Sequence, residues 1–474
     1  MDMKKGLLFL FVLLFFASCT LPGISMPEIP QVLNIACVGN FESLEPCGEN
    51  PPPEKFVRQV FEGLTSFDEN LNVVPALAKS WEVADGKIVM HLSDAIFSDG
   101  TKLTALDVIK SFECLSKTDQ SWIVKNVSGF TLFTQGRSSS ILGIEEVDDL
   151  TISIKTIDSL EYFLKKLANP RAAIWKQGEL PLGTGVFCIT KFTPGSKIIL
   201  VPNPYSKVQP KLTKINFMIR MSHEAAFEDF RQGRVAVAPL DESLVSSAKD
   251  ESHTLMLSYD SHSFLAVGFN CKNGVTSKVE TRLAIASEID SNDLNQKALQ
   301  GLHIPIGFAN KSEQQINLSK SEINLAIPEG LDENIAHAIA LQIKNKTGMK
   351  TNVEKMTNDN FVGAILNGKT QMFVFGMMQN TPDDYEMLSL PIANVVLAAG
   401  FGYDTANLST LLKSSNEAVD RQAILAETRM LLEKDVPFIP IIELRSYVVV
   451  SDTVKDYLPY AWGGGVLSAC SIGR

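Results

Sequence analysis

The sequence has few of the residue patterns on which metal, redox and hydrolytic chemistry depend. No CxxC motif occurs, and the six histidines are scattered without the spacing of metal ligands, so no metal site and no cofactor is expected. Gly183-Thr184-Gly185 lacks the last glycine of G-x-G-x-x-G, and no phosphate loop or nucleophile elbow is present. A hydrolase could recruit a pair such as Ser222 and His223, but such adjacency is accidental in most proteins. The sequence therefore predicts no catalytic residue and a protein that is not an enzyme.

Positive charge is also scarce. Lys and Arg number 43 against 54 Asp and Glu, which gives a net charge of -11. Nucleic acid is not an expected partner, because neutralising phosphates requires a basic face. Beyond the N-terminal segment, no apolar run approaches the roughly 20 residues of a membrane-spanning helix. With 45% hydrophobic and 20% charged residues, the composition is that of a globular protein, and the length of 474 residues suggests about two or three domains.

The N-terminus has the pattern of an export signal. An apolar run over residues 6–16 follows two lysines and precedes Cys19, with small residues between them. This arrangement resembles the bacterial lipobox, in which the cysteine is lipidated, for example with palmitate, and becomes the new N-terminus. We therefore expect a signal peptide over residues 1–18 and a lipidated tether over residues 19–30, which would anchor the protein on the extracytoplasmic side of a bacterial membrane. The alternative is an ordinary signal peptide followed by an incidental cysteine.

Disulfides are allowed in an exported chain of this composition. Cys37 and Cys47 are close enough in sequence to pair across a loop, but free buried cysteines, which behave as small apolar residues, are an equal alternative. Apart from Cys19, the cysteines are even in number: Cys37, Cys47, Cys114, Cys188, Cys271 and Cys470.

Hydrophobic patterning predicts a mixed α/β chain. A β-branched apolar run over residues 32–38 is typical of a buried strand, and residues 80–92 predict a hairpin around an Asp-Gly turn. A Ser-Asp-Gly turn then precedes Thr104 and Asp107, which are spaced to cap a helix. Residues 323–378 alternate strand and helix patterns, which indicates parallel pairing.

The order of several segments resembles a known family. They are "LNIACVGNFESLEP", "QVFEGLTSFDENLNVVPALAKSWEVADGKIVMHLSDAIFSDGTKLTALDVIKSF", "LGTGVFCITKF", "VPNPY" and "VETRLAIASEID". Together they resemble the extracytoplasmic solute-binding proteins of peptide and nickel ABC transporters, a family of oligopeptide- and dipeptide-binding lipoproteins. The resemblance implies an α/β fold of the periplasmic-binding-protein type, with two lobes, a cleft between them and an additional domain on lobe 1.

Carried onto this chain, the resemblance implies domain boundaries. Lobe 1 would comprise residues 31–48, 179–262 and 452–474. The additional domain would be residues 49–178, and lobe 2 would be residues 263–451. In this arrangement the chain crosses twice between the lobes, the Ser-Asp-Gly turn and the Thr104 helix start belong to the scaffold, and a solute is buried between the lobes.

Peptide-binding members pair an acidic residue with the ligand's terminal ammonium. That acid stands four residues before the proline of a D-x-x-D-P-x-x-F-L motif, and the nearest match here is "NTPDDYEML". The amine-binding position then falls on Asn380 and the proline position on Asp384. A neutral amide cannot neutralise an ammonium. Three alternatives follow: Asp383 or Asp384 takes the role through a shifted loop, the amine is held differently, or the ligand is not an ordinary peptide.

Four further positions are candidate ligand contacts by the same resemblance. Glu54 lies where some members place an acidic contact, although a solvated glutamate is an equal alternative. Trp122 lies where an aromatic reaches into the pocket in some relatives, and a core tryptophan is the alternative. Met377 or its neighbour Met378 replaces an aromatic that precedes the motif. Asn270 corresponds to the entry into lobe 2, where a structural role is favoured.

The expected function is that of a lipid-anchored, monomeric receptor of an ABC importer, which captures short peptides or peptide-like solutes and delivers them to membrane permease subunits. One alternative keeps the fold and changes the solute to glutathione, haem or a nickel chelate. Another is a surface lipoprotein that serves adhesion or sensing.

Overall fold

The computed structural model describes residues 29–48, 50–307, 318, 321–415, 420–459 and 467–473. The predicted signal peptide, Cys19 and most of the predicted tether lie outside the described residues. Residues Gln31–Arg474 form one compact unit. No helix in the described part of the chain combines the length and the apolar character that crossing a bilayer requires.

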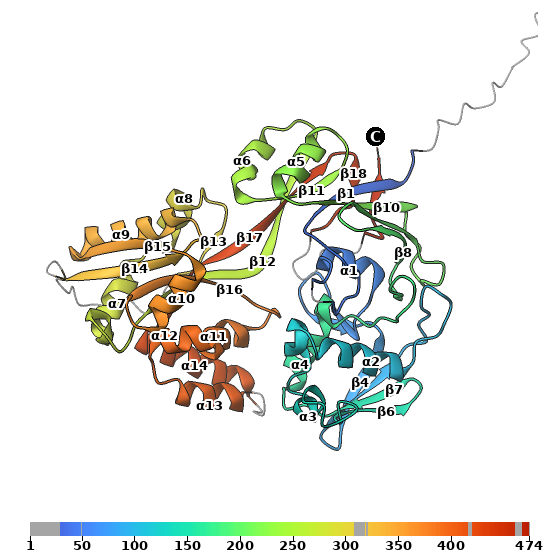
Figure 1. Ribbon diagram of the computed structural model, residues 1–474, viewed down its shortest axis with the longest axis horizontal. Helices are drawn as coiled ribbons and strands as arrows, with labels where there is room; N and C mark the ends of the chain where they lie inside the picture. The colour runs from blue at the N-terminus through green and yellow to red at the C-terminus, as the bar shows by residue number, and fades with distance from the viewer. Residues whose placement is uncertain are drawn as a thin grey trace, which may run out of the picture. The chain divides into compact units, whose positions relative to one another are not determined.

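One large mixed sheet runs through this unit (Figure 1). Its two longest strands, β12 (Thr254–Phe269) and β17 (Phe438–Ser451), pair antiparallel with each other and connect two lobes. In one lobe the sheet continues through β11 (Val237–Leu240), β1 (Val32–Val38), β10 (Lys214–Arg220), β9 (Lys197–Pro202) and β8 (Phe187–Thr193). In the other it continues through β16 (Met372–Met378), β14 (Glu322–Pro328) and β15 (Lys350–Met356), and β13 (Ile304–Pro305) pairs with β17.

Helices cover the sheet in both lobes (Figure 1). In the first lobe α5 (His223–Arg231) and α6 (Glu242–Lys249) pack against β11. The second lobe contains α7 (Val279–Glu288), α8 (Ser291–Ala298), α9 (Glu333–Thr347), α10 (Asn358–Leu366), α11 (Asp384–Ala393), α12 (Val395–Phe401), α13 (Ala406–Ser414) and α14 (Arg421–Asp435). The predicted alternation of strand and helix is confirmed, because β14 pairs parallel with both β15 and β16.

A second sheet belongs to the additional domain. It has the order β4 (Ala78–Ala84), β5 (Lys87–Leu92), β7 (Thr151–Ile154) and β6 (Ile144–Asp148), and α2 (Ala105–Leu115), α3 (Phe130–Thr134) and α4 (Leu160–Ala168) accompany it. Its core is separate from those of the two lobes and includes Met90, Phe112 and Phe163, which are fully buried. The short elements of the unit are α1 (Glu54–Val60), β2 (Thr65–Phe67), β3 (Val73–Pro75), η1 (Asp119–Ile123), η2 (Pro170–Ala172), η3 (Val275–Ser277), β18 (Val454–Lys455) and β19 (Ser471–Ile472).

The predicted hairpin and helix start in this domain are confirmed. β4 and β5 pair antiparallel around Asp85 and Gly86, both of which have positive φ. At the start of α2, the backbone N–H and the hydroxyl of Thr104 each donate to the Asp107 carboxylate at 2.8 Å. These bonds satisfy groups at a helix end that would otherwise lack partners, which gives the motif an architectural role.

A buried ion pair joins Asp158, just before α4, to Lys166 in the last turn of the same helix. The Lys166 ammonium donates to the Asp158 carboxylate at 2.7 Å, and the two side chains are 1% and 0% exposed. Asn126 donates to the other Asp158 oxygen, also at 2.7 Å. Both charges are therefore removed from water, and each depends on the other for its neutralisation.

The structure does not contain the Cys37–Cys47 disulfide that the sequence allowed. Cys47 forms a disulfide with Cys114 of α2, 67 residues further along the chain. Cys37 is free and buried, because its side chain faces the core beneath β1, so the buried-thiol alternative holds for this residue. Cys188, Cys271 and Cys470 are also free. The disulfide therefore links the loop before α1 to the additional domain.

Candidate functional site: a cavity beside the connecting strands

A cavity of about 510 Å³ lies beside the strands that connect the lobes. Its walls come from β1, α1, η1, η2, β12 and β17 and from the loop that follows β16. The cavity is lined by Ala36, Cys37, Val38, Pro53, Glu54, Lys55, Gln120, Trp122, Asn169, Arg171, Phe217, His223, Pro239, Tyr259, Asp260, Ser261, His262, Met378, Gln379, Asn380, Ser446, Val448, Tyr457 and Pro459. Segments far apart in the sequence therefore share one cavity, open to solvent on one side, of the size that small solutes occupy.

Three of the predicted site residues, Glu54, Trp122 and Asn380, line this cavity together. Glu54 is the first residue of α1, directly after three prolines, and its carboxylate lies 3.5 Å from the Arg171 guanidinium. The Trp122 ring nitrogen donates to the Gln120 side chain at 3.4 Å. The three residues come from separate elements, so only the tertiary fold brings them to one site.

Hydrogen bonds fix the backbone of Asn380 at the cavity wall. Its carbonyl accepts a bond of 2.7 Å from the side chain of Asn169, and its N–H donates to the Glu386 carboxylate. Glu386 also accepts from the Thr381 N–H at 3.1 Å and from the Tyr162 hydroxyl at 2.8 Å. Burial raises the pKa of Glu386 in spite of these bonds. The loop that carries Asn380 is therefore held by Tyr162 of α4 and by Asn169, which directly follows this helix of the additional domain.

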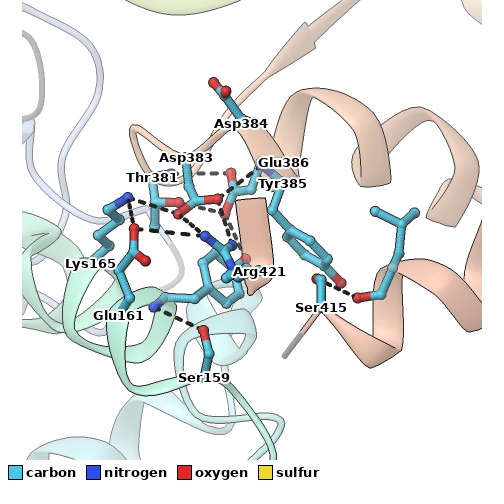
Figure 2. A network of polar contacts seen from close by, with 12 residues as sticks. Ser159, Glu161, Lys165, Thr381, Asp383, Asp384, Tyr385, Glu386, Ser415 and Arg421 are labelled. Atoms are coloured by element: carbon cyan, nitrogen blue, oxygen red, sulfur yellow. Dashed lines mark hydrogen bonds and ion pairs between the residues drawn. The ribbon is translucent and has the colours of Figure 1, made fainter. Parts of the chain in front are cut away.

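Asp383 and Asp384 lie away from the cavity. Figure 2 shows Arg421 and Lys165 converging on Asp383, while Asp384 points away from both. The Asp383 carboxylate lies 2.7 Å from Arg421 and 2.9 Å from Lys165, and its side chain is 1% exposed. Burial opposes the ionisation of Asp383, but the hydrogen bonds and charges of these two cations outweigh it and hold its pKa below the ordinary value. This carboxylate therefore already has its counter-charges, and it also caps α11 by accepting from the Tyr385 N–H.

The other predicted residues have different surroundings. Met377 packs in the second lobe's core, whereas Met378, the next residue of β16, lines the cavity. This difference follows from the strand geometry, because successive side chains point to opposite faces. Asn270 is buried, and its side-chain oxygen accepts the N–H groups of Lys272 and Asn273 at 3.0 and 2.9 Å, which is a turn-forming role.

Sequence reasoning missed the charged residues that share the cavity with Glu54. Lys55 follows it on α1, Arg171 lies in η2, and Asp260 lies on β12 next to His262. Burial lowers the pKa of His262 to about 4, so this imidazole is neutral near pH 7. One signal was available: the polar run Asp260-Ser261-His262 interrupts an otherwise apolar strand.

The strands β12 and β17 lose their regular register beside the cavity. Asp260 is opposite Arg445, and the next paired position joins Phe264 to Glu443. A hydrogen bond with Asp260, burial and the charge of Asp260 together raise the pKa of Glu443 to about 7. The protonated form of Glu443 is therefore favoured at the point where the paired strands are irregular.

This pair predicts a pH-dependent stability. The pKa of Glu443 is raised in the folded state, so its favourable contribution is complete below the unfolded pKa of about 4.3 and is lost as the pH rises through about 7. Relative to the wild type, the free energy of unfolding of Glu443→Gln should therefore increase by about 1–2 kcal/mol when the pH is raised from 5 to 8. The expected increase is small because water reaches the two carboxyl groups and screens their interaction. Denaturant unfolding at both pH values measures this change. Glu354→Gln, on the exposed side of β15, is the control. If the difference in unfolding free energy between the wild type and Glu443→Gln is the same at both pH values, the assignment is contradicted.

Comparisons with known proteins place the chain in a family. Residues 72–314 match the model of the bacterial extracellular solute-binding proteins, family 5. The chain is 25% identical over 288 residues to the periplasmic murein peptide-binding protein MppA of Escherichia coli (strain K12), covering 54% of this chain and 52% of MppA. It is also 25% identical over 218 residues to the periplasmic oligopeptide-binding protein OppA of the same strain, covering 41% and 40%. In these alignments the chain spans about half the length of the curated relatives or less.

Solved structures support the same fold over nearly the whole chain. The unliganded open form of the murein tripeptide binding protein MppA superimposes with a TM-score of 0.79 at 18% identity, covering 94% of this chain and 98% of that one. The two-lobed α/β architecture with an additional domain, expected from the sequence, is thereby confirmed. The family match over residues 72–314 includes the additional domain's sheet and the first of the two connecting strands. This chain therefore belongs to the bacterial extracellular solute-binding proteins of family 5.

Proposed function

We propose that this protein is the lipid-anchored receptor of an ABC importer and that it captures short peptides for delivery to a membrane permease. The cavity beside β12 and β17 would hold the solute, and Cys19 would carry the lipid. The domain boundaries expected from the sequence are part of the proposal, because they place the cavity between lobe 1, its additional domain and lobe 2.

The observation that carries the proposal is the convergence of Glu54, Trp122 and Asn380 on one cavity. Aromatic side chains among many polar and charged groups, in a cavity of about 510 Å³, suit a short peptide, whose backbone and termini offer polar partners, better than a large cofactor. The relatives MppA and OppA are named for binding murein peptides and oligopeptides, which supports a peptide over the glutathione, haem and nickel alternatives.

The ligand's amine would not meet a carboxylate at position 380. Asn380 is neutral, and the charge of Asp383 is already compensated by Arg421 and Lys165. Because an unpaired ammonium is costly to bury, the amine must find its counter-charge elsewhere in the cavity. Of the described carboxylates that line it, Glu54 already lies 3.5 Å from Arg171, which leaves Asp260.

Calorimetry and thermal unfolding with defined peptides test this proposal. The full chain, expressed with its leader and extracted from membranes, should bind pools of free dipeptides to pentapeptides and melt at a higher temperature with them, because a ligand specific for the folded state stabilises it. Mass spectrometry of the material that copurifies should detect peptides. If the melting temperature is the same with every pool and no peptide copurifies with the protein, peptide capture is contradicted and the adhesion or sensing alternative is favoured.

The anchor is tested in the same preparations. Cys19→Ser should move the protein from the membrane fraction to the soluble fraction without changing its melting temperature. An ordinary signal peptide with an incidental cysteine predicts that the wild type and the variant fractionate alike.

A further inference from the structure

Lys55 is a cation at the cavity wall whose charge has no carboxylate partner among the described residues. It is the second residue of α1, and no described carboxylate oxygen lies within the 4.0 Å of an ion pair from its ammonium. The ammonium lies 4.8 Å from the ring centroid of Tyr457. The nearby thiols of Cys37 and Cys470 do not neutralise it, because burial raises the pKa of Cys37 to about 12 and that of Cys470 to about 11. An aromatic face attracts a cation but does not neutralise it.

The neighbouring charges on this wall are already paired. Glu54 lies 3.5 Å from Arg171, and Arg171 also donates to the carbonyl of Pro52 at 2.7 Å. Glu54 and Arg171 thus compensate each other, and Lys55 lies beside them without an ion-pair partner among the described residues. Burial lowers the pKa of Lys55 to about 8, so most of the population is still protonated at pH 7.

An uncompensated ammonium in a partly buried wall costs free energy, which an anionic group of a ligand would recover. We propose that Lys55 binds a carboxylate of the solute, so that the acidic end of the ligand lies against α1 and the ring of Tyr457. This inference rests on the proposed function and makes it more specific: the preferred solutes are peptides with a free carboxylate near this wall. The carboxylate is either the C-terminus of the peptide or an acidic side chain.

Three probe peptides distinguish these sources. Trialanine has a free C-terminus, trialanine amide has none, and Ala-Glu-Ala amide has only a side-chain carboxylate. Calorimetry on the full chain should show that at least one free-acid probe binds roughly tenfold to a hundredfold tighter than trialanine amide, the range expected for a charge-assisted hydrogen bond. Preference for trialanine identifies the C-terminus as the source, and preference for Ala-Glu-Ala amide identifies the side chain.

Lys55→Met should remove this preference, so that the variant binds trialanine and Ala-Glu-Ala amide no tighter than trialanine amide. Lys55→Arg should retain most of it, and Lys55→Gln is a second neutral variant if the methionine variant folds poorly. Lys110→Met, which removes the same charge from an exposed position on α2, should bind all three probes as the wild type does.

Two failures have different meanings. If the wild type binds the acid and amide probes equally, or if Lys55→Met keeps the preference, the assignment to Lys55 is wrong while peptide capture stands. If the wild type binds none of these probes and none of the peptide pools, the proposed function itself fails and this inference fails with it.

Discussion

Asp383→Asn should lower the free energy of unfolding by about 3 kcal/mol or more, because it removes one partner of a buried ion pair. The Asp383 carboxylate has two cationic partners, Arg421 at 2.7 Å and Lys165 at 2.9 Å, and the Arg421 side chain is only 7% exposed. Without the carboxylate, the guanidinium stays buried with only the more distant Glu161, 3.8 Å away, to compensate it. Denaturant unfolding of the wild type and the variant measures the loss.

Asp384→Asn is the matched control for this prediction. Asp384 is the first residue of the same helix, but its side chain is 64% exposed and lies 3.4 Å from the similarly accessible Arg429. Surface pairs of this kind contribute about 0–1 kcal/mol, so the control should unfold almost as the wild type does. The opposite result for Asp383→Asn, unchanged unfolding with a large loss of peptide affinity, would show that Asp383 binds the ligand's amine after all.

Loss of the Cys47–Cys114 disulfide should have an effect of similar size. The two cysteines are separated by 67 residues, and the chain-entropy model then gives about 4 kcal/mol of stabilisation through the unfolded state. Cys47→Ser/Cys114→Ser should therefore unfold at a much lower denaturant concentration than the wild type. Adding a reductant to the wild type should lower its midpoint to that of the double variant.

Cys188→Ser controls for the removal of a thiol. Cys188 is free and partly buried, so its variant should keep both the stability and the reductant sensitivity of the wild type. A wild-type midpoint that does not respond to reductant, with thiols at Cys47 and Cys114 that react with an alkylating agent after unfolding, would contradict the disulfide.

Local features of the fold could be predicted because their signals are local. The Asp85-Gly86 turn, the bonds between Thr104 and Asp107, and the alternation that gives β14, β15 and β16 all depend on neighbouring residues. The disulfide partner of Cys47 could not be predicted in this way. Its identity depends on where α2 lies in space, and the patterns of the intervening chain do not contain that information.

Residues of the candidate site could be predicted only where a family pattern marks them. Glu54, Trp122 and Asn380 were placed by resemblance, and they line one cavity. Lys55 and Asp260 were missed because a charged residue near a helix start or within a strand is usually solvated, and only its tertiary neighbours distinguish it. Asp383 was a candidate because it is an acid in the segment that the family pattern marks. Its ion pairs with Arg421 and Lys165 could not be predicted, because these partners lie far away in the sequence.

The pairing of Asp158 with Lys166 limits how this protein can evolve. Either substitution alone leaves a lone charge in the interior of the additional domain, whereas exchange of both for apolar residues of similar volume is often tolerated. Replacement of the ion pair by two apolar residues therefore requires both substitutions at nearly the same time. The two positions should covary among homologues. The same constraint makes this pair a useful landmark for aligning distant homologues whose overall identity is low.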